Sequence, residues 1–351
     1  GYQVPAELLD YKPIYRDAVF NRYKIKRIPD TMNVEQLAEL VLEQSESALV
    51  VLNTIADTQA LYQLLEGRVP AILLNTHFPD RHRKLKLRAA RRNLEKEKKF
   101  VLISTMLIEA GVDIDFPIIF RDMCPFPSLI QTSGRTNRNG MRKQGILYLF
   151  ELIDAKGQRA WKKIYQQTED YISFTDNNIS SEIIERDLLK LHEERARKIG
   201  QSLIVGKFVC EGGSGHSDAG GTEVRLCDRI PELNYPEVAK FQLIQKAGED
   251  WVRYFIPRNQ RDRRFEKLAE IVNTDTDQNL HERLVRRARI KHALKQMSDS
   301  MVEIRIKQGE SCTREADSVL GINKLPLSHY SHRSGIIPTP LNMNSQSGQQ
   351  T

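Results

Sequence analysis

Cysteine is scarce in this sequence of 351 residues, and the few cysteines do not cluster. No two of them form a C-x-x-C pair, and they are widely spaced: Cys124, Cys210, Cys227 and Cys312. We therefore expect neither a zinc ribbon nor a disulfide framework, but the reduced thiols of a cytoplasmic protein. No apolar run reaches the length of a membrane-spanning helix, so we expect no membrane partner and no signal peptide.

Three motifs of nucleotide and metal chemistry are also missing. No lysine follows a glycine and precedes a serine or threonine, so the phosphate loop G-x-x-x-x-G-K-[ST] is not present. There is no D-E-x-x acidic box for magnesium, and no His-Asp pair of adjacent residues. We therefore expect no metal site, and we expect this chain by itself to bind ATP poorly and to hydrolyse none.

The composition is that of a globular protein with an excess of positive charge. Apolar residues make up 40% of the chain and charged residues 28%, and the length suits one large or two ordinary domains. The formal net charge of +7 favours a polyanionic partner, because long-range attraction follows net charge.

Short apolar runs that alternate with helical patterns predict an α/β fold. The runs with the length of buried strands are Ala48–Leu52, Ala71–Leu74, Phe100–Ile103, Ile118–Phe120 and Ile146–Phe150. Such βα alternation predicts a parallel sheet with helices on both faces. Ligands bind at the carboxyl ends of the strands in sheets of this kind, so we expect functional residues there.

We expect four parts along the chain. Residues 1–30, rich in Tyr, Arg and Lys, have the composition of a linker that arrives from a missing upstream lobe, so we expect the chain to be a fragment. Residues 31–155 hold the predicted parallel sheet, and residues 156–335 a smaller mixed α+β accessory domain. Residues 336–351 carry no charge and are rich in Asn, Ser and Gln, which predicts a disordered tail.

Residues 100–140 contain two polar motifs in a fixed order. The first, at the end of a strand, is S-T followed by E-A-G-x-D; the second is Q-x-x-G-R-x-x-R. On a helix that begins at Ser128, the side chains of Gln131, Arg135 and Arg138 would project from nearly the same face. Two guanidiniums beside an amide suit the oxygens of a transferring phosphoryl group. R-x-x-R alone is more often a solvated charged face, and it is the ordered pair of motifs that favours phosphate chemistry.

The two motifs resemble motifs V and VI of the second RecA-like lobe of superfamily 2 helicases, and most closely those of the CRISPR-associated helicase of type I interference. The matching residues are Ser104, Thr105, Leu107 to Pro117, Gln131, Gly134, Arg135, Asn137, Arg138 and Gly140. The sequence departs at Met106, where the family commonly has Gln, and at Thr132, where many relatives carry Arg. The second change removes one possible phosphate or base contact.

The resemblance implies a role for each matching residue. Arg138 would be the arginine finger on the γ-phosphate, supported by the catalytic residues Arg135 and Gln131. The residues expected to face the nucleotide are Glu109, Gly111 and Asp113. The residues expected to contact nucleic acid are Asn53, Thr54, Thr76, His82, Arg83 and Thr105. Without the resemblance, Asn53-Thr54 would be a plain helix cap, and His82 a surface imidazole.

The implied function is that of the C-terminal half of an ATP-dependent single-stranded DNA translocase or helicase in CRISPR type I interference. ATP and Mg²⁺ would be bound mainly by the missing upstream lobe. The other expected partners are single-stranded DNA, a CRISPR surveillance complex and a metal-dependent nuclease domain. Two alternatives stay open: a helicase lobe of a DNA-repair or restriction translocase, and a non-catalytic binding module derived from a helicase.

One charged helix has two interpretations. Residues 81–99 contain eleven Lys, Arg or His side chains and only two glutamates. Such a run is usually a solvent-facing surface, but it could also extend an electrostatic track for nucleic acid.

Overall fold

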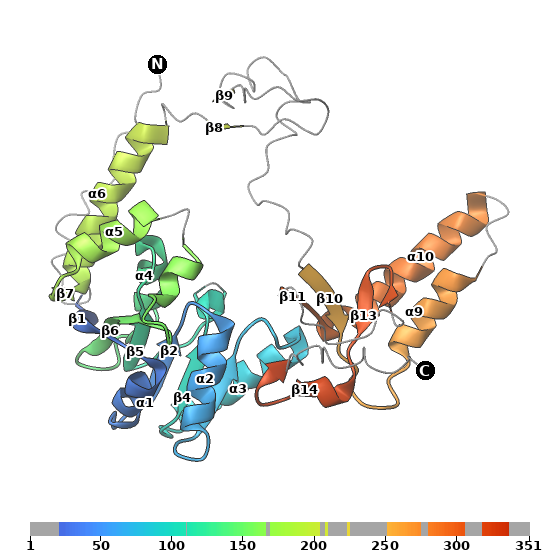
Figure 1. Ribbon diagram of the computed structural model, residues 1–351, viewed down its shortest axis with the longest axis horizontal. Helices are drawn as coiled ribbons and strands as arrows, with labels where there is room; N and C mark the ends of the chain where they lie inside the picture. Colours follow the sequence, from blue (N-terminus) through green and yellow to red (C-terminus); the bar gives the residue numbers. More distant parts are fainter. Residues whose placement is uncertain are drawn as a thin grey trace, which may run out of the picture. The chain divides into compact units, whose positions relative to one another are not determined.

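The computed structural model describes residues 21–109, 111–165, 169–203, 208–209, 223–224, 251–274, 280–305 and 318–336 (Figure 1). The chain divides into two compact units, the first being Gly1–Leu188 with Asp250–Thr351 and the second Leu189–Glu249. In the second unit, β8 (Phe208–Val209) pairs antiparallel with β9 (Glu223–Val224). The boundaries expected at residues 155 and 335 stay predictions, whereas the one at residue 30 falls inside a strand, β1 (Tyr23–Met32).

A seven-stranded sheet forms the core of the first unit, with its strands in the order β3-β4-β2-β5-β6-β1-β7. Neighbouring strands are parallel throughout, except that β7 joins the edge antiparallel to β1. The strands are β1 (Tyr23–Met32), β2 (Ala48–Val51), β3 (Ala71–Leu74), β4 (Val101–Ser104), β5 (Ile118–Asp122), β6 (Gly145–Leu152) and β7 (Glu182–Ile184). The predicted α/β class is confirmed, and the five predicted strands are all present.

Strand β1 corrects the expected linker. Residues 23–30 form most of this strand, which pairs with β6 on one side and β7 on the other. Tyr23 and Ile25 are buried, whereas the lysines that alternate with them are partly exposed. An alternating pattern of this kind is a strand signal, but the charged residues and Pro29 give the segment the composition of a linker.

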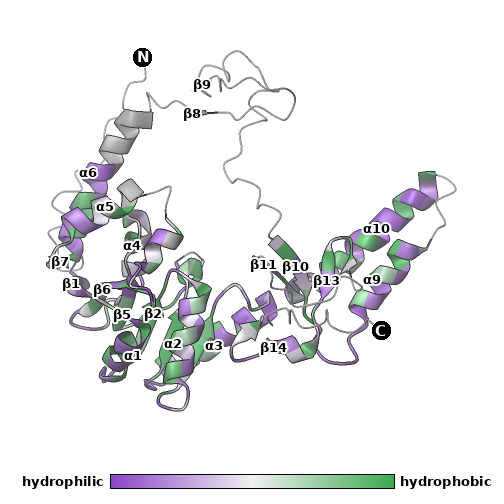
Figure 2. Ribbon diagram, in the orientation of Figure 1, coloured by the Kyte–Doolittle hydropathy of each residue, from purple (hydrophilic) through white to green (hydrophobic). Residues whose placement is uncertain are grey.

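Helices cover both faces of the sheet. The helices before Leu188 are α1 (Val34–Leu42), α2 (Ile55–Leu65), α3 (Asp80–Glu95), α4 (Phe126–Ser133) and α5 (Glu169–Asn178), with short 3-10 turns η3 (Met106–Ile108) and η4 (Ala160–Lys163). Helix α6 (Glu185–Leu203) begins in this unit and continues into the second. The buried residues of α1 and α2 share one apolar cluster with Val50, Ile103 and Phe120 of the strands. After β3 the chain reverses direction across the sheet, so right-handed crossovers place α3 and α4 on the other face. Figure 2 shows apolar residues gathered around β2, β4 and α2.

A smaller sheet with two helices follows in the sequence. Its strands lie in the order β11-β10-β13-β12. The elements of this region are β10 (Trp251–Phe255), α9 (Arg264–Asn273), α10 (Leu280–Met297), η6 (Ser298–Ser300), β11 (Met301–Arg305), β12 (Ser318–Val319), β13 (Ile322–Lys324), η8 (Leu327–His329), β14 (Tyr330–Ser331) and β15 (Gly335–Ile336). Phe255 packs with α9 and α10, and its neighbours Tyr254 and Ile256 join the large cluster instead. This mixed α+β region agrees with the expected composition of the accessory part.

Candidate functional site

The arginine motif lies in a turn that follows α4. The helix ends at Ser133, and beyond it the backbone pairs with Phe116. The Phe116 amide donates to the Arg135 carbonyl (3.0 Å), and the Asn137 amide donates to the Phe116 carbonyl (2.9 Å). The expectation that Arg135 and Arg138 lie on one helix is therefore wrong, because these backbone hydrogen bonds replace the next helical turn.

Two side chains fix the turn that carries Arg138. Asn137 has a left-handed φ of 45°, a conformation that Asn tolerates better than most residues. Its side-chain amide donates to the carbonyls of Arg22 (2.8 Å) and Arg142 (2.9 Å). The Asp115 carboxylate accepts the backbone amides of Arg138 (2.9 Å) and of the residue after it (3.2 Å). The backbone of Arg138 is thus held in place independently of its side chain.

Both guanidiniums reach the loop between β4 and β5, which contains the residues expected to face the nucleotide. The Nε of Arg138 lies 3.3 Å from an oxygen of Asp113, and Nη2 of Arg135 donates to the carbonyl of Glu109 (2.7 Å). Gly111 is exposed in the same loop and has a φ of 68°, which favours glycine. The structure therefore brings five of the six predicted catalytic and nucleotide-facing residues to one loop. Gln131, the sixth, lies on α4 with its side chain exposed.

The two arginines differ in how firmly they are held. The side chain of Asp113 is 79% exposed and that of Arg138 39%. An exposed ion pair contributes only about 0–1 kcal/mol. The Arg138 guanidinium can therefore leave Asp113, at little cost in free energy, for an anion that binds it more tightly. The Nε of Arg135 is buried and has no hydrogen-bond partner in the part of the chain that the structure describes. An anion whose oxygens reached both guanidiniums would satisfy that donor.

A buried arginine joins this loop to the ends of two strands. Arg121 is fully buried; it donates to Asn53 Oδ1 (2.9 Å), Glu109 Oε1 (3.2 Å) and Ser128 Oγ (2.8 Å). The same Glu109 oxygen also accepts from Ser128 (2.6 Å) and Thr132 (3.1 Å). Burial works to lower the pKa of Arg121, but the acidic groups around it raise that pKa above its usual value, so the side chain stays charged. The Glu109 carboxylate therefore binds Arg121, while the Glu109 backbone carbonyl binds Arg135.

Asp122 extends the same network toward β6. Its carboxylate accepts from the Asn53 side-chain amide (2.6 Å) and from the Leu152 backbone amide (3.0 Å). Burial raises the pKa of Asp122 to about 7. The Asn53 amide also donates to the Met123 carbonyl (2.8 Å), so both polar atoms of the Asn53 side chain bind protein groups. The structure gives Asn53 a role in joining β2 to β5.

Three residues expected to contact nucleic acid follow adjacent strands. Asn53, Thr76 and Thr105 come after β2, β3 and β4, and these strands are neighbours in the sheet. Thr76 is exposed and Thr105 is 7% exposed. Thr54 caps α2, its hydroxyl accepting the Asp57 amide (3.0 Å), so the simple helix-cap role is present. The nucleic-acid contacts of these residues stay predictions.

His82 and Arg83, at the start of α3, have different surroundings. Arg83 is partly exposed and lies 3.7 Å from Asp80. His82 is buried, with its Nδ1 2.5 Å from the Tyr330 hydroxyl and its ring stacked on the Tyr330 ring. Burial lowers the pKa of His82 to about 4, so its ring is neutral at pH 7. A buried neutral imidazole is poorly suited to hold a phosphate, and the structure favours a role in joining α3 to the C-terminal region.

Other basic residues of α3 take part in the same contact. Arg81 donates to the carbonyls of Ile256 (3.2 Å) and Pro257 (3.3 Å). Lys86 donates to the carbonyl of Arg333 (3.3 Å). The first turns of this basic helix are thus used to bind the C-terminal region, a use that neither sequence interpretation included.

Acid is expected to weaken the contact between α3 and the C-terminal region. Burial lowers the pKa values of His77 and His82 to about 4, whereas histidine in an unfolded chain titrates near about 6.5. Between these values the unfolded chain binds more protons, so stability that is complete above pH ~6.5 is lost as the pH falls toward ~4. Thermal melts at pH 7 and pH 5 should show a Tm lower by a few degrees at the acidic pH.

His82→Phe is the control for this expectation. Phenylalanine keeps a ring against Tyr330 but cannot take up a proton, so the variant should lose less Tm than the original chain between the two pH values. Equal losses in the two proteins would show that the protonation of His82 does not contribute.

Some features are not found among the described residues. No three His, Cys, Asp or Glu side chains in that part of the chain are grouped so that they could hold a metal ion. No helix there is both long and apolar enough to cross a membrane. Cys124 is a buried free cysteine, and burial raises the pKa of its thiol to about 11.

The comparisons with known proteins point to one family. Residues 44–141 match the family model described as "CRISPR-associated nuclease/helicase Cas3, C-terminal". The matched range runs from just before β2 to the turn after α4, so it includes the loop, both arginines and the Arg121 network.

Individual relatives cover more of the chain. It is 26% identical to the putative CRISPR-associated nuclease/helicase Cas3 of Methanocaldococcus jannaschii over 188 residues. These matched residues cover 50% of this chain and 26% of the relative. It is 28% identical over 231 residues to the CRISPR-associated nuclease/helicase Cas3 of Methanothermobacter thermautotrophicus, 64% of this chain and 26% of the relative. The chain thus spans about a quarter of the length of these relatives.

A solved structure shows the shared fold. The crystal structure of T. fusca Cas3-ADP is similar with a TM-score of 0.52 and 14% identity, over 87% of this chain and 40% of that one.

Proposed function

We propose that this chain, a CRISPR helicase lobe by its similarity to the C-terminal part of Cas3, supplies the arginine finger and part of the DNA track of an ATP-driven single-stranded DNA translocase. In this proposal a second RecA-like lobe binds ATP and Mg²⁺, and the lobe described above closes over them. A CRISPR surveillance complex and a metal-dependent nuclease domain are the proposed partners of the intact protein.

The observation that carries the proposal is the fixed turn that holds Arg138 and Arg135 at one loop. Its backbone is set by Asp115 and Asn137, while the exposed pair with Asp113 leaves the guanidinium of Arg138 able to change partner. Positive charge that is positioned in advance stabilises the transition state of phosphoryl transfer, because it need not reorganise during the reaction.

Each arginine has its own part in the proposed hydrolysis. Arg138 leaves Asp113 and places its charge beside the γ-phosphate oxygens. Arg135, anchored on the Glu109 carbonyl, offers its unpartnered Nε as a further donor. Gln131, exposed on α4, supports the two arginines. ATP bound with Mg²⁺ supplies the phosphoanhydride bond that is cleaved.

The Arg121 network is the proposed link between nucleotide and DNA. On the nucleotide side it holds Glu109, in the loop with Gly111 and Asp113, and on the DNA side it holds Asn53 at the end of β2. DNA contacts are proposed for Asn53-Thr54 and for three further residues already predicted, Thr76, Thr105 and Arg83; His82, buried against Tyr330, is not among them. Closing of the lobes on ATP and reopening after hydrolysis would then change how tightly the lobes bind the DNA strand.

An ATPase measurement on the isolated chain tests whether ATP binding and hydrolysis require the second lobe. We expect weak ATP binding and no turnover, because this sequence supplies the arginines but not the phosphate loop G-x-x-x-x-G-K-[ST]. The intact protein should turn over ATP, and single-stranded DNA should stimulate it. Robust DNA-dependent turnover by the isolated chain would contradict the proposal.

A further inference from the structure

Helix α10 leaves most of its surface uncovered. The structure describes this helix completely, and Met297 is its only buried residue. Leu280 and Leu284 are 70% and 55% exposed. In Figure 2 apolar and polar residues alternate along the helix.

The base of the helix pair is anchored, so the exposed surface is held in a defined position. Phe265 and Leu268 of α9 and Met297 of α10 pack with Phe255 and Ile322 of the small sheet. Beyond this cluster, the two helices contact each other and form the walls of a groove.

The groove between α9 and α10 has a volume of about 730 Å³ and is lined mainly by apolar atoms. Ile271 of α9 and Ala288 of α10 are among its apolar residues. Four basic side chains also line it: Arg264, Lys267, Arg289 and His292. Arg264 is already paired with Asp262 and Asp299. The groove therefore combines an apolar floor with a positively charged rim.

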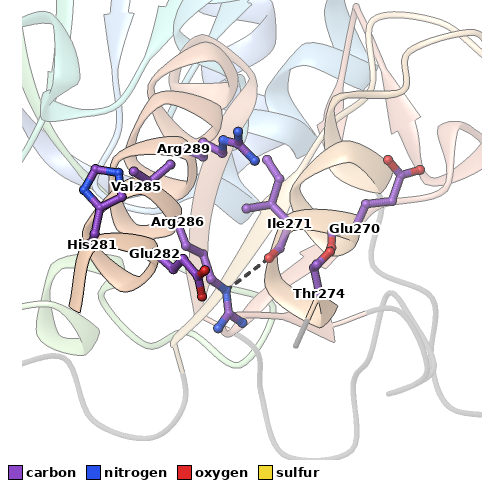
Figure 3. Close-up of a pocket in the computed structure, with 8 residues that line it drawn as sticks. All are labelled: Glu270, Ile271, Thr274, His281, Glu282, Val285, Arg286 and Arg289. Carbon is purple, nitrogen blue, oxygen red and sulfur yellow. Dashed lines mark hydrogen bonds between the residues drawn. The ribbon is translucent and has the colours of Figure 1, made fainter. Parts of the chain in front are cut away.

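Figure 3 shows the end of the helix pair where the groove continues. Val285 and Arg289 of α10 face Ile271 of α9, and Arg286 donates to the Ile271 carbonyl (3.2 Å), which ties the helices together. Each helix has a glutamate at this end, Glu270 on α9 and Glu282 on α10. The positive rim is thus strongest away from this end, near Lys267.

Five basic residues of α10 carry charge that no described acidic residue pairs with. Arg283, Arg287, Lys291 and Lys295 follow one another at intervals of four residues, all exposed. Neither they nor Arg289 form an ion pair with any residue that the structure describes. Like charges four apart on a helix destabilise it by about 0.2–0.5 kcal/mol per pair, so a negatively charged partner would stabilise α10.

We propose that this groove docks an acidic amphipathic helix of a protein partner. A helix in a groove presents apolar side chains at intervals of three and four residues, which the floor around Ile271 and Ala288 would bury. Acidic residues beside that apolar stripe would pair with Lys267, Arg289 and His292. A single-stranded nucleic acid fits less well, because it needs aromatic side chains on which bases stack, and none of the residues lining the groove is Phe, Tyr or Trp.

A binding assay with a defined probe tests the proposal without ATP or DNA. The probe is a fluorescent helical peptide of Leu, Ala, Glu and Gln with its leucines on one face; a scrambled peptide of the same composition is its control. The full 351-residue chain should bind the amphipathic peptide at least about tenfold more tightly than the scrambled one, because only the first presents an apolar stripe. Ala288→Glu, which places a negative charge on the floor, should abolish the difference.

Two charge reversals separate a docking site from general attraction. Arg289→Glu and Lys295→Glu change the net charge equally, but only Arg289 lines the groove. We expect Arg289→Glu to weaken peptide binding about tenfold or more, and Lys295→Glu less than about twofold. Equal effects of the two variants, equal binding of both peptides, or displacement of the peptide by a single-stranded oligonucleotide would each overturn the proposal. None of these outcomes bears on the proposed ATPase function.

Discussion

Arg138→Ala is expected to lower the DNA-stimulated ATP turnover of the intact protein by a factor on the order of 10³ or more and to leave ATP binding nearly unchanged. The loss should fall on kcat, because the finger acts on charge that develops only in the transition state. Among the described residues the side chain of Arg138 pairs only with the exposed Asp113, so its removal costs the folded lobe little.

The structure offers a matched control for this variant. Arg142 lies in the same turn region with a similarly exposed side chain, 3.8 Å from Glu46. Arg142→Ala also removes one exposed arginine, and its backbone contacts with Asn137 do not depend on the side chain. We expect it to keep turnover within about threefold of the original protein. Unchanged turnover in Arg138→Ala, or an equal loss in Arg142→Ala, would contradict the assignment of the finger.

The sheet could be predicted from the sequence wherever a strand is apolar throughout. Ala48–Val51 and Val101–Ser104 are buried along their whole length, so their residues form continuous apolar runs. Strand β1, between β6 and β7, is no less important to the sheet, but every second residue near its start is a lysine or arginine that reaches solvent. Its place beside β6 depends on pairing with a segment more than a hundred residues away, which local composition does not reveal.

The members of the site could be predicted, but their local structure could not. The resemblance named Arg135, Arg138 and the loop with Asp113, and the structure brings them together. Helical spacing placed both arginines on one helix, because it takes no account of competing bonds such as those of Phe116. The sequence predicted no role for Asp115, which holds the turn. One carboxylate among several in a loop does not indicate which group it binds.

Arg121 was missed for a related reason, although the sequence contains a signal for it. The strand Ile118–Asp122 is apolar until its last two residues, which are a charged pair, and both are fully buried. A charged pair that directly continues a buried apolar strand indicates an internal network, because such groups are rarely buried without partners.

The network around Arg121 should also dominate the stability of the lobe. Arg121→Met is expected to lower the free energy of unfolding by about 3–5 kcal/mol, because it leaves the buried Glu109 carboxylate without its cation. The measurement is a urea titration followed by the fluorescence of Trp161, which is buried in the lobe, in a Trp251→Phe background. Arg68→Met is the matched control, since Arg68 binds Glu39 through two hydrogen bonds at the surface; it should change the free energy of unfolding far less than Arg121→Met does.

A double variant shows whether the loss of stability in Arg121→Met comes from the unpaired charge of Glu109. Glu109→Gln keeps a side-chain oxygen that can accept from Ser128 and Thr132 but removes the negative charge. In the Arg121→Met background it should therefore restore part of the lost stability, so the double variant should be less destabilised than the sum of the single variants by about 1 kcal/mol or more. Strict additivity, or equal costs for Arg121→Met and Arg68→Met, would show that the ion pair between Arg121 and Glu109 does not hold the loop between β4 and β5 to the strands.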